Sequence, residues 1–339
     1  LKALDLQSDG VAIWVLQQFS NPNYGAVGSV SFNWIGKYQL TTLLADTSFS
    51  ADGQRWFNAG FSSDTVQGSQ RLVLGSQVNK TLFYGYSYSY VNGNYQQAFV
   101  GRLTSSGALD QSFGNHGLVL LADDQLAQME VNTVLEAGSN QLYVAGSGLD
   151  TNNDQIGFVA RLDQDGSVDQ GFAGGIVDLI PAQLGSYNGS AAVHLQLKAD
   201  GHLIVGAEYS QSQDNSDIAL LQLNTDGSLD AGNFGSSAAG FTLFTEIDTN
   251  AQTEERLSQM KLDPADDTLV IAGQYKLMAD PRLYVARFNE TGLLMNTANS
   301  PSDTFGDAAQ GYSVINLVDN SNDQTKYSEY LNALDFDAG

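Results

Sequence analysis

A short motif recurs along the chain and constrains the fold more than any other feature. It carries a Phe followed by a Gly-rich stretch, as in LDQSFGNHG at 109–117 and VDQGFAGG at 168–175. The Phe residues of the five copies are Phe49, Phe113, Phe172, Phe234 and Phe305, which stand 64, 59, 62 and 71 residues apart. Because self-similarity at one period is typical of repeat architectures, this spacing predicts about five tandem repeats.

Each repeat contains four short apolar runs separated by tight turns. NTVLEAGSNQLYVAGSG at 132–148 holds two such runs, and GFVARLDQDGSVD at 157–169 holds a third before an Asp-Gly turn. Runs rich in Val, Leu, Ile, Phe and Tyr that end at Asp-Gly, Asn-Gly or Ser-Gly predict antiparallel strands. No stretch keeps a 3.6-residue apolar period, so long helices are not expected.

Four antiparallel strands in each tandem unit predict an all-β fold, a β-propeller with about five visible blades. A β-solenoid would have shorter and more uniform coils, and sandwich domains would need about 100 residues each. We expect the blades at 1–61, 62–123, 124–182, 183–246 and 247–318. Residues 319–339 would form the first strand of a further repeat or an exchanged strand.

The motif resembles the bacterial delta-60 repeat, a family of propeller-like tandem units in large secreted or surface proteins. The resemblance rests on residues 102–117, 161–175 and 222–240, with weaker copies at 37–53 and 287–311. The first copy lacks the Gly turn, and the fifth carries the insertion MNTANSPSD. The resemblance implies a propeller fold and a location outside the cell or on its surface, and it implies no reaction.

The two ends of the chain resemble each other. LKALDLQSDG at 1–10 and YLNALDFDAG at 330–339 both look like the first strand of a repeat. Either the natural protein continues past Gly339, or the last strand pairs outside its own ring. The second alternative predicts a homo-oligomer in which 331–336 or 3–6 completes a neighbour's sheet by strand addition.

The charge of the chain argues against two classes of partner. With 14 Lys and Arg against 38 Asp and Glu, the formal net charge is −24. Nucleic acids and anionic membrane surfaces both bind through cationic side chains, so we expect neither as a partner. No apolar run is long enough to span a bilayer, and the absence of Cys excludes thiolate sites.

The strongest metal-like motif is DQDGSVD, in which Asp163, Asp165 and Asp169 surround Gly166. Alternating Asp residues around a Gly turn supply the oxygen ligands that Ca²⁺ prefers, so these three are the candidate calcium ligands. A full calcium loop would normally have another acid at the position of Arg161. The alternative is that Asp and Gly are present for turn geometry, with the carboxylates capping backbone amides.

A second unusual segment is LFYGYSYSYVNGNY at 82–95, in which Tyr alternates with small residues. On a strand, period two places alternate residues on one face. An aromatic stripe of this kind suits the stacking of sugars or the anchoring of a protein, which makes Tyr86, Tyr88, Tyr90 and Tyr95 candidate binding residues. The alternative is packing between blades.

Signals for catalysis are weak. No G-x-S-x-G nucleophile motif occurs, and the three His residues have no zinc-type spacing. Acidic loops would make one face negative, which suits solubility or a cationic partner. We therefore expect no cofactor, with Ca²⁺ as a possible exception, and a non-enzymatic bacterial module, secreted or at the cell surface, that binds a protein or a polysaccharide. The alternatives are a self-assembling structural subunit and a hydrolase or lyase that acts on sugars in a central channel.

Overall fold

In the computed structural model the described residues are 2–8, 12–21, 30–39, 41–52, 54–57, 71–74, 80–89, 95–138, 141–179, 189–212, 215–245, 253–277, 280–296, 298, 305–306 and 309–315. They form twenty β-strands and one short 3-10 helix, η3 (Ser236–Ala238). No described helix is long and apolar enough to cross a membrane.

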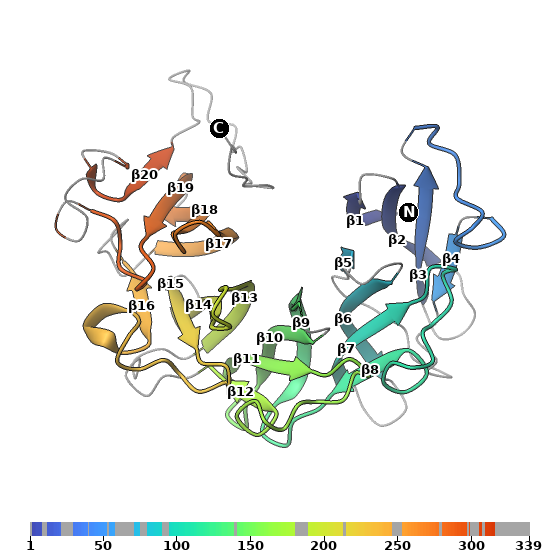
Figure 1. The fold of residues 1–339 in the computed structure, drawn as a ribbon, viewed down its shortest axis with the longest axis horizontal. Coiled ribbons are helices and arrows are strands. Elements are labelled where there is room, and N and C mark those ends of the chain that lie inside the picture. Colours follow the sequence, from blue (N-terminus) through green and yellow to red (C-terminus); the bar gives the residue numbers. More distant parts are fainter. Residues whose placement is uncertain are drawn as a thin grey trace. The chain divides into compact units, whose positions relative to one another are not determined.

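The strands follow the chain in groups of four (Figure 1). Their bounds are β1 (Lys2–Ser8), β2 (Ala12–Asn21), β3 (Val30–Gln39), β4 (Gln54–Phe57), β5 (Arg71–Leu74), β6 (Thr81–Ser89), β7 (Tyr95–Leu103), β8 (Leu118–Leu121), β9 (Ala127–Glu136), β10 (Leu142–Leu149), β11 (Gln155–Leu162), β12 (Ile176–Asp178), β13 (Gly189–Leu197), β14 (Leu203–Ser212), β15 (Asn215–Leu223), β16 (Phe241–Phe244), β17 (Thr253–Leu262), β18 (Leu269–Leu277), β19 (Asp280–Phe288) and β20 (Tyr312–Ile315).

Each group of four is an antiparallel meander in sequence order. The sheets β1–β4, β5–β8 and β9–β12 are separate. The groups β13–β16 and β17–β20 are joined by one parallel pairing, Ser216 with Glu254. Each group lies inside one of the five predicted repeats. The groups are therefore numbered from first to fifth, like the repeats.

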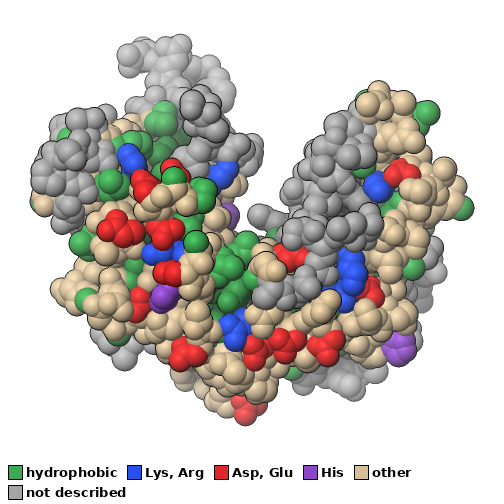
Figure 2. Space-filling view, in the orientation of Figure 1, with side chains coloured by type: hydrophobic (Ala, Val, Ile, Leu, Met, Phe, Trp, Pro, Cys, Tyr) green, Lys and Arg blue, Asp and Glu red, His purple; other side chains and the backbone are tan. Residues whose placement is uncertain are grey.

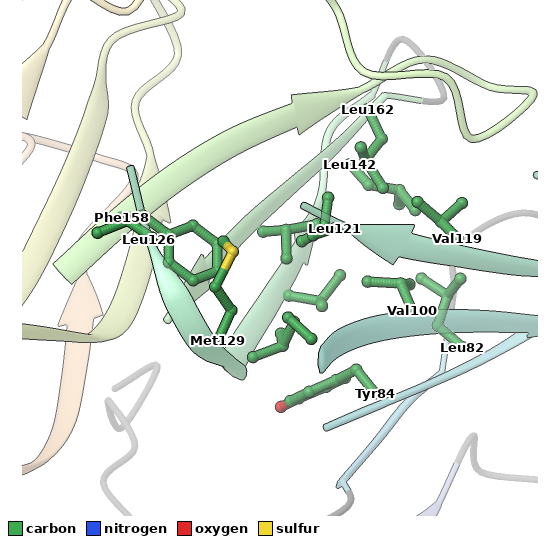
Figure 3. Packing of buried hydrophobic residues seen from close by; sticks show 14 of the residues in the cluster. Leu82, Tyr84, Val100, Val119, Leu121, Leu126, Met129, Leu142, Phe158 and Leu162 are labelled. Atoms are coloured by element: carbon green, nitrogen blue, oxygen red, sulfur yellow. The ribbon is translucent and has the colours of Figure 1, made fainter. Parts of the chain in front are cut away.

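The chain divides into two compact units. Unit 1 comprises residues 1–170 and 174–176, and unit 2 comprises residues 171–173 and 177–339. In unit 1, the main core lies between the second and third sheets (Figure 3). Its labelled members are Leu82, Tyr84, Val100, Val119 and Leu121 from the second repeat, and Leu126, Met129, Leu142, Phe158 and Leu162 from the third.

Unit 2 has a core of the same kind between the strand groups of the fourth and fifth repeats, β13–β16 and β17–β20. Its largest fully buried side chains include Phe234, Phe244, Tyr284 and Phe288. The ring centroids of Phe244 and Phe288 lie 5.6 Å apart in an edge-to-face arrangement. In both units, therefore, apolar strand faces pack sheet against sheet, as the alternating apolar runs of the sequence predict.

The recurring motif forms the same turn in each of the last four repeats. After the third strand, the chain turns at a Gly with positive φ and returns, so that a motif residue donates its amide to the end of that strand. The bond runs from Asp110 to Arg102, from Asp169 to Arg161, and from Asp230 to Gln222, at 2.8–2.9 Å. The Asp-Gly and Ser-Gly turns of the sequence therefore fix the geometry of this corner.

The Phe of each motif packs under the turn of the following repeat. A Cβ atom at Gly166 would lie 3.0 Å from Cδ2 of Phe113, and one at Gly292 would lie 2.3 Å from Cζ of Phe234. Gly107 and Gly227 are related in the same way to Phe49 and Phe172. Only Gly fits these turns, because φ is positive and the ring of the preceding repeat fills the space of a side chain.

The two candidate exchange strands have different outcomes. Residues 3–6 lie in β1, which is already paired with β2 of its own sheet. Strand addition by residues 3–6 stays a prediction. Residues 331–336 lie outside the described residues.

Candidate functional site

A hollow of about 680 Å³ lies in unit 1 and is lined by residues of the second and third repeats. The lining is polar and contains two cations and two carboxylates. It consists of Lys80, Arg102, Ser112, Gln141, Asp163, Gln164, Asp165 and Ser167. A concave site of this size with several convergent polar groups is the usual setting for a small ligand.

The second repeat supplies the cationic wall through Asp110. Arg102, at the end of β7, places Nε 2.8 Å from Oδ2 of Asp110, and Lys80 places Nζ 2.9 Å from the same oxygen. The other carboxylate oxygen accepts hydrogen bonds from the amide and the hydroxyl of Ser112. Burial alone would raise the pKa of Asp110, but the Ser112 hydroxyl, Lys80, the Ser112 amide and Arg102 together hold this pKa well below its usual range.

Arg102 also joins the two repeats. Its side chain is only 4% exposed, and Nη1 donates a 2.7 Å hydrogen bond to the carbonyl of Gln164 in the turn of the third repeat. The guanidinium lies over the ring of Phe113, 4.3 Å from its centroid, which adds a cation–π contact. These contacts fix the position of the Arg102 side chain in the lining of the hollow.

The third repeat supplies the carboxylate wall through its Asp-Gly turn. Asp165 accepts hydrogen bonds from the hydroxyl and the amide of Ser167, at 2.6 and 2.9 Å, and these bonds lower the pKa of Asp165. Asp163 accepts a hydrogen bond of 3.1 Å from the side-chain amide of Gln141. The amide of Gly114 donates to the carbonyl of Asp165 and ties this turn to the preceding repeat.

The three predicted calcium ligands do not share one position. Asp163 and Asp165 line the hollow, whereas Asp169 is paired with Arg161, whose Nη2 lies 2.7 Å from Oδ2. Among the described residues, no group of three or more His, Asp or Glu is arranged to hold a metal ion. The turn thus has the geometry of the capping alternative, and calcium binding stays a prediction.

The predicted tyrosine stripe is described only in part. Tyr84 is buried in the core and Tyr86 is half-buried, both on β6. For Tyr88 and Tyr95 only the strand backbone is described, and Ser89 pairs with Tyr95 across β6 and β7. Tyr90 lies outside the described residues. The proposed role of Tyr86, Tyr88, Tyr90 and Tyr95 in binding stays a prediction.

The sequence analysis missed Lys80 and Gln141 as members of the hollow. Each stands directly before the second strand of its repeat, ahead of β6 and β10. Each also reaches the motif Asp of its own repeat, at 2.9 Å for Lys80 with Asp110 and 3.5 Å for Gln141 with Asp169. Their shared position before the second strand is the signal that would have identified them.

Figure 2 shows acidic side chains more numerous than Lys and Arg on the face in view, as the net charge of −24 leads one to expect. The pairing of Lys80 and Arg102 on one carboxylate is therefore unusual for this chain. It places two cations opposite Asp163 and Asp165, so that the hollow presents charges of both signs.

Two segments of the chain match a β-propeller family. The matching family is described as a domain of unknown function (DUF5122) beta-propeller, and the matched residues are 138–172 and 198–232. Both segments run from the second strand of a repeat through the turn to the motif. The predicted β-propeller fold is thereby confirmed, together with the propeller-like nature of the repeats.

A comparison with curated proteins finds no match. Among solved structures, the chain is similar to a glucose dehydrogenase at 11% identity and TM-score 0.34, over 69% of this chain and 63% of that one. It is similar to a GH43_12 from a capybara gut metagenome at 10% identity and TM-score 0.36, over 85% of this chain and 52% of that one. It is also similar to an exo-1,5-alpha-L-arabinanase from a bovine ruminal metagenomic library at 9% identity and TM-score 0.34, over 86% and 94%.

The chain spans less than two thirds of the length of the first two of these structures. Such low identity transfers no residue's role to this chain. The prediction of a non-enzymatic binding module is nevertheless wrong in view of these comparisons, because the similar propellers are glycoside hydrolases and other enzymes.

Proposed function

We propose that this chain hydrolyses glycosidic bonds and that the hollow of unit 1 is the site of the reaction. The observation that supports this proposal is the presence of two carboxylates, Asp163 and Asp165, in one concave polar site. Glycoside hydrolysis generally uses two carboxyl groups that flank the bond to be cleaved. The ammonium of Lys80 supplies donors for sugar oxygens.

The two carboxylates have different surroundings, which suggests different roles. The hydrogen bonds from Ser167 lower the pKa of Asp165 and keep it ionised, so Asp165 would be the carboxylate of the pair that takes a proton from water. Asp163 would give a proton to the leaving oxygen. The glycosidic C–O bond breaks, the hydroxyl of water joins the anomeric carbon, and Asp165 takes the proton that water loses. The proton given by Asp163 completes the released alcohol, and exchange with solvent then returns a proton to Asp163 and removes one from Asp165.

The motif of the second, third and fourth repeats also supports the finer resemblance to the delta-60 repeat, and with it a location outside a bacterial cell or on its surface. An enzyme in that location would act on polysaccharide rather than on intracellular metabolites.

The test is turnover of a panel of aryl glycosides and plant or bacterial polysaccharides. Replacement of Asp163 or Asp165 by Asn is expected to lower kcat by about 100-fold or more, which is typical for loss of an acid or base. Asp226→Asn is the matched control, because Asp226 accepts the same two bonds from Ser228 as Asp165 does from Ser167, at 2.6 and 3.0 Å, and lies in unit 2. Absence of hydrolysis across the panel by folded protein, or equal loss in all three variants, would refute the proposal.

A further inference from the structure

Two cations of the hollow, Lys80 and Arg102, meet on one carboxylate, that of Asp110. Lys80 and Arg102 both contact Oδ2 of Asp110, at 2.9 and 2.8 Å. The Asp110 side chain is only 9% exposed, and its other oxygen is occupied by Ser112. Two positive charges and one negative charge therefore meet at a largely dehydrated position, where electrostatic interactions are stronger than in water.

The corresponding positions of the third and fourth repeats do not hold two cations on one carboxylate. The motif Asp of the third repeat, Asp169, is held by Arg161 and by the neutral side chain of Gln141. In the fourth repeat, Asp230 accepts a 2.6 Å hydrogen bond from the neutral amide of Gln222. Of these three positions, only that of the second repeat holds two cations on one motif Asp, whereas in the fifth repeat Met295 stands in the place of the Asp and Arg287 in the place of Arg102.

Lys80 has room to bind a further group. Its side chain is 29% exposed and lines the hollow, and an ammonium has three N–H donors, of which Asp110 uses one. A carboxylate is the group that best satisfies an ammonium with free donors, because charge-assisted hydrogen bonds are shorter and stronger than neutral ones. The opposite wall, with Asp163 and Asp165, would repel a second anion but accepts hydroxyl groups.

We infer that the hollow binds an acidic sugar, a uronic-acid residue whose carboxylate lies against Lys80 and whose hydroxyls face Asp163 and Gln141. This inference rests on the proposed function and names its substrate class. Lys80, Asp163 and Gln141 all belong to unit 1, so the distances between them are set within one compact unit.

The experiment is a calorimetric titration of the full chain with D-galacturonate, D-galactose and acetate, in the Asp165→Asn variant so that no turnover occurs. Galacturonate is expected to bind about tenfold or more tightly than galactose, as one charge-assisted hydrogen bond would give. Lys80→Met should abolish this preference, and Lys80→Arg should keep it.

The control is Lys37→Met, which removes a Lys–Asp ion pair of the first repeat outside the hollow, that of Lys37 with Asp46 at 3.2 Å. It should leave the preference unchanged. Equal affinity for both sugars, or a preference that survives Lys80→Met, would overturn the inference, as would binding of neither sugar. Affinity for acetate equal to that for galacturonate would mean a simple anion site and would also overturn it. Turnover of neutral glycosides without this preference would leave hydrolysis standing and the acidic substrate class refuted.

Discussion

The junction between the second and third repeats and the junction between the fourth and fifth repeats use the same backbone with different side chains. In the first, the amide of Gly114 donates to the carbonyl of Asp165, and in the second, the amide of Gly235 donates to the carbonyl of Thr291. In each, a turn Gly lies over the Phe of the preceding repeat. Each junction lies within one unit, unit 1 and unit 2 respectively.

The difference lies in the cation that crosses the junction. In the first junction, Arg102 binds the motif Asp of its own repeat and also reaches the carbonyl of Gln164. In the second, Gln222 stands in the place of Arg102, and Lys198 reaches the carbonyl of Glu290 at 3.2 Å. A cation therefore contacts the turn carbonyl in both cases, but from different positions in the repeat.

The lysines at the two junctions differ in how their charges are used. Lys198 is only 8% exposed and also pairs with Asp267, so its charge is used inside the structure. Lys80, by contrast, faces the hollow. The backbone contacts define the repeat, and the placement of charge distinguishes one junction from the next.

The largest effect is expected from replacing the Gly that both junctions share. Gly292→Ala should lower the free energy of unfolding by about 3 kcal/mol, because its Cβ would overlap the ring of Phe234 and its φ of 76° is unfavourable for Ala. Urea unfolding followed by circular dichroism would measure this loss.

Gly174→Ala is the control for backbone strain alone. Gly174 has a φ of 88°, and a Cβ there would meet nothing within 4 Å. Its loss should be about 1 kcal/mol. Equal losses in the two variants would mean that the packing of turn on Phe contributes nothing to stability.

The shared part of the junctions could be predicted from the sequence. The Phe spacing identified the repeats, and the Asp-Gly turns identified the corner after the third strand. The Asp-x-Ser spacing of Asp165 and Ser167 also fits the capping alternative, and the structure has these hydrogen bonds. These features are local, so a short window of sequence contains all the partners.

The distinguishing part could not be predicted, because its partners are distant in the chain. Lys80 and Asp110 are 30 residues apart, and Arg102 and Gln164 are 62 apart. Which side chains meet there depends on how the second and third sheets pack. The hollow therefore became visible only with the structure, although two of its residues had been singled out as possible calcium ligands.

A smaller effect is expected from making the first junction resemble the second. Arg102→Gln introduces the residue type that the fourth repeat has at this position, Gln222. It should lower the free energy of unfolding at neutral pH by about 2 kcal/mol, because Asp110 keeps Lys80 but loses its buried partner Arg102. Because the pKa of Asp110 is depressed in the folded state, its ion pairs stabilise the protein above the ordinary pKa of Asp, about 3.9, and this contribution is lost as the pH falls below that value.

The difference between Arg102→Gln and the parent should therefore stay constant above about pH 4 and shrink as the pH falls from there toward the depressed pKa of Asp110 in the folded protein. Urea unfolding of both proteins across this range would measure it, and the subtraction removes the contribution of the other carboxyl groups. A difference that stays constant with pH would show that Arg102 acts by packing on Phe113 rather than through the charge of Asp110.

The smallest effect concerns the substitute cation of the second junction. Lys198→Met should lower the free energy of unfolding by about 1 kcal/mol, because the carbonyl of Glu290 and the carboxylate of Asp267 lose a donor at a buried position. Lys198 donates to the turn carbonyl of the second junction as Arg102 does in the first. If this contact is what stabilises the junction, adding Gln222→Arg to Lys198→Met should restore most of the lost stability, because an Arg at position 222 would reach the turn from the place that Arg102 occupies. Gln222→Arg alone should restore nothing, because Lys198 already occupies the carbonyl. A double variant as unstable as the sum of the single ones would mean that the two junctions place their cations independently, and that the likeness between them ends at the backbone.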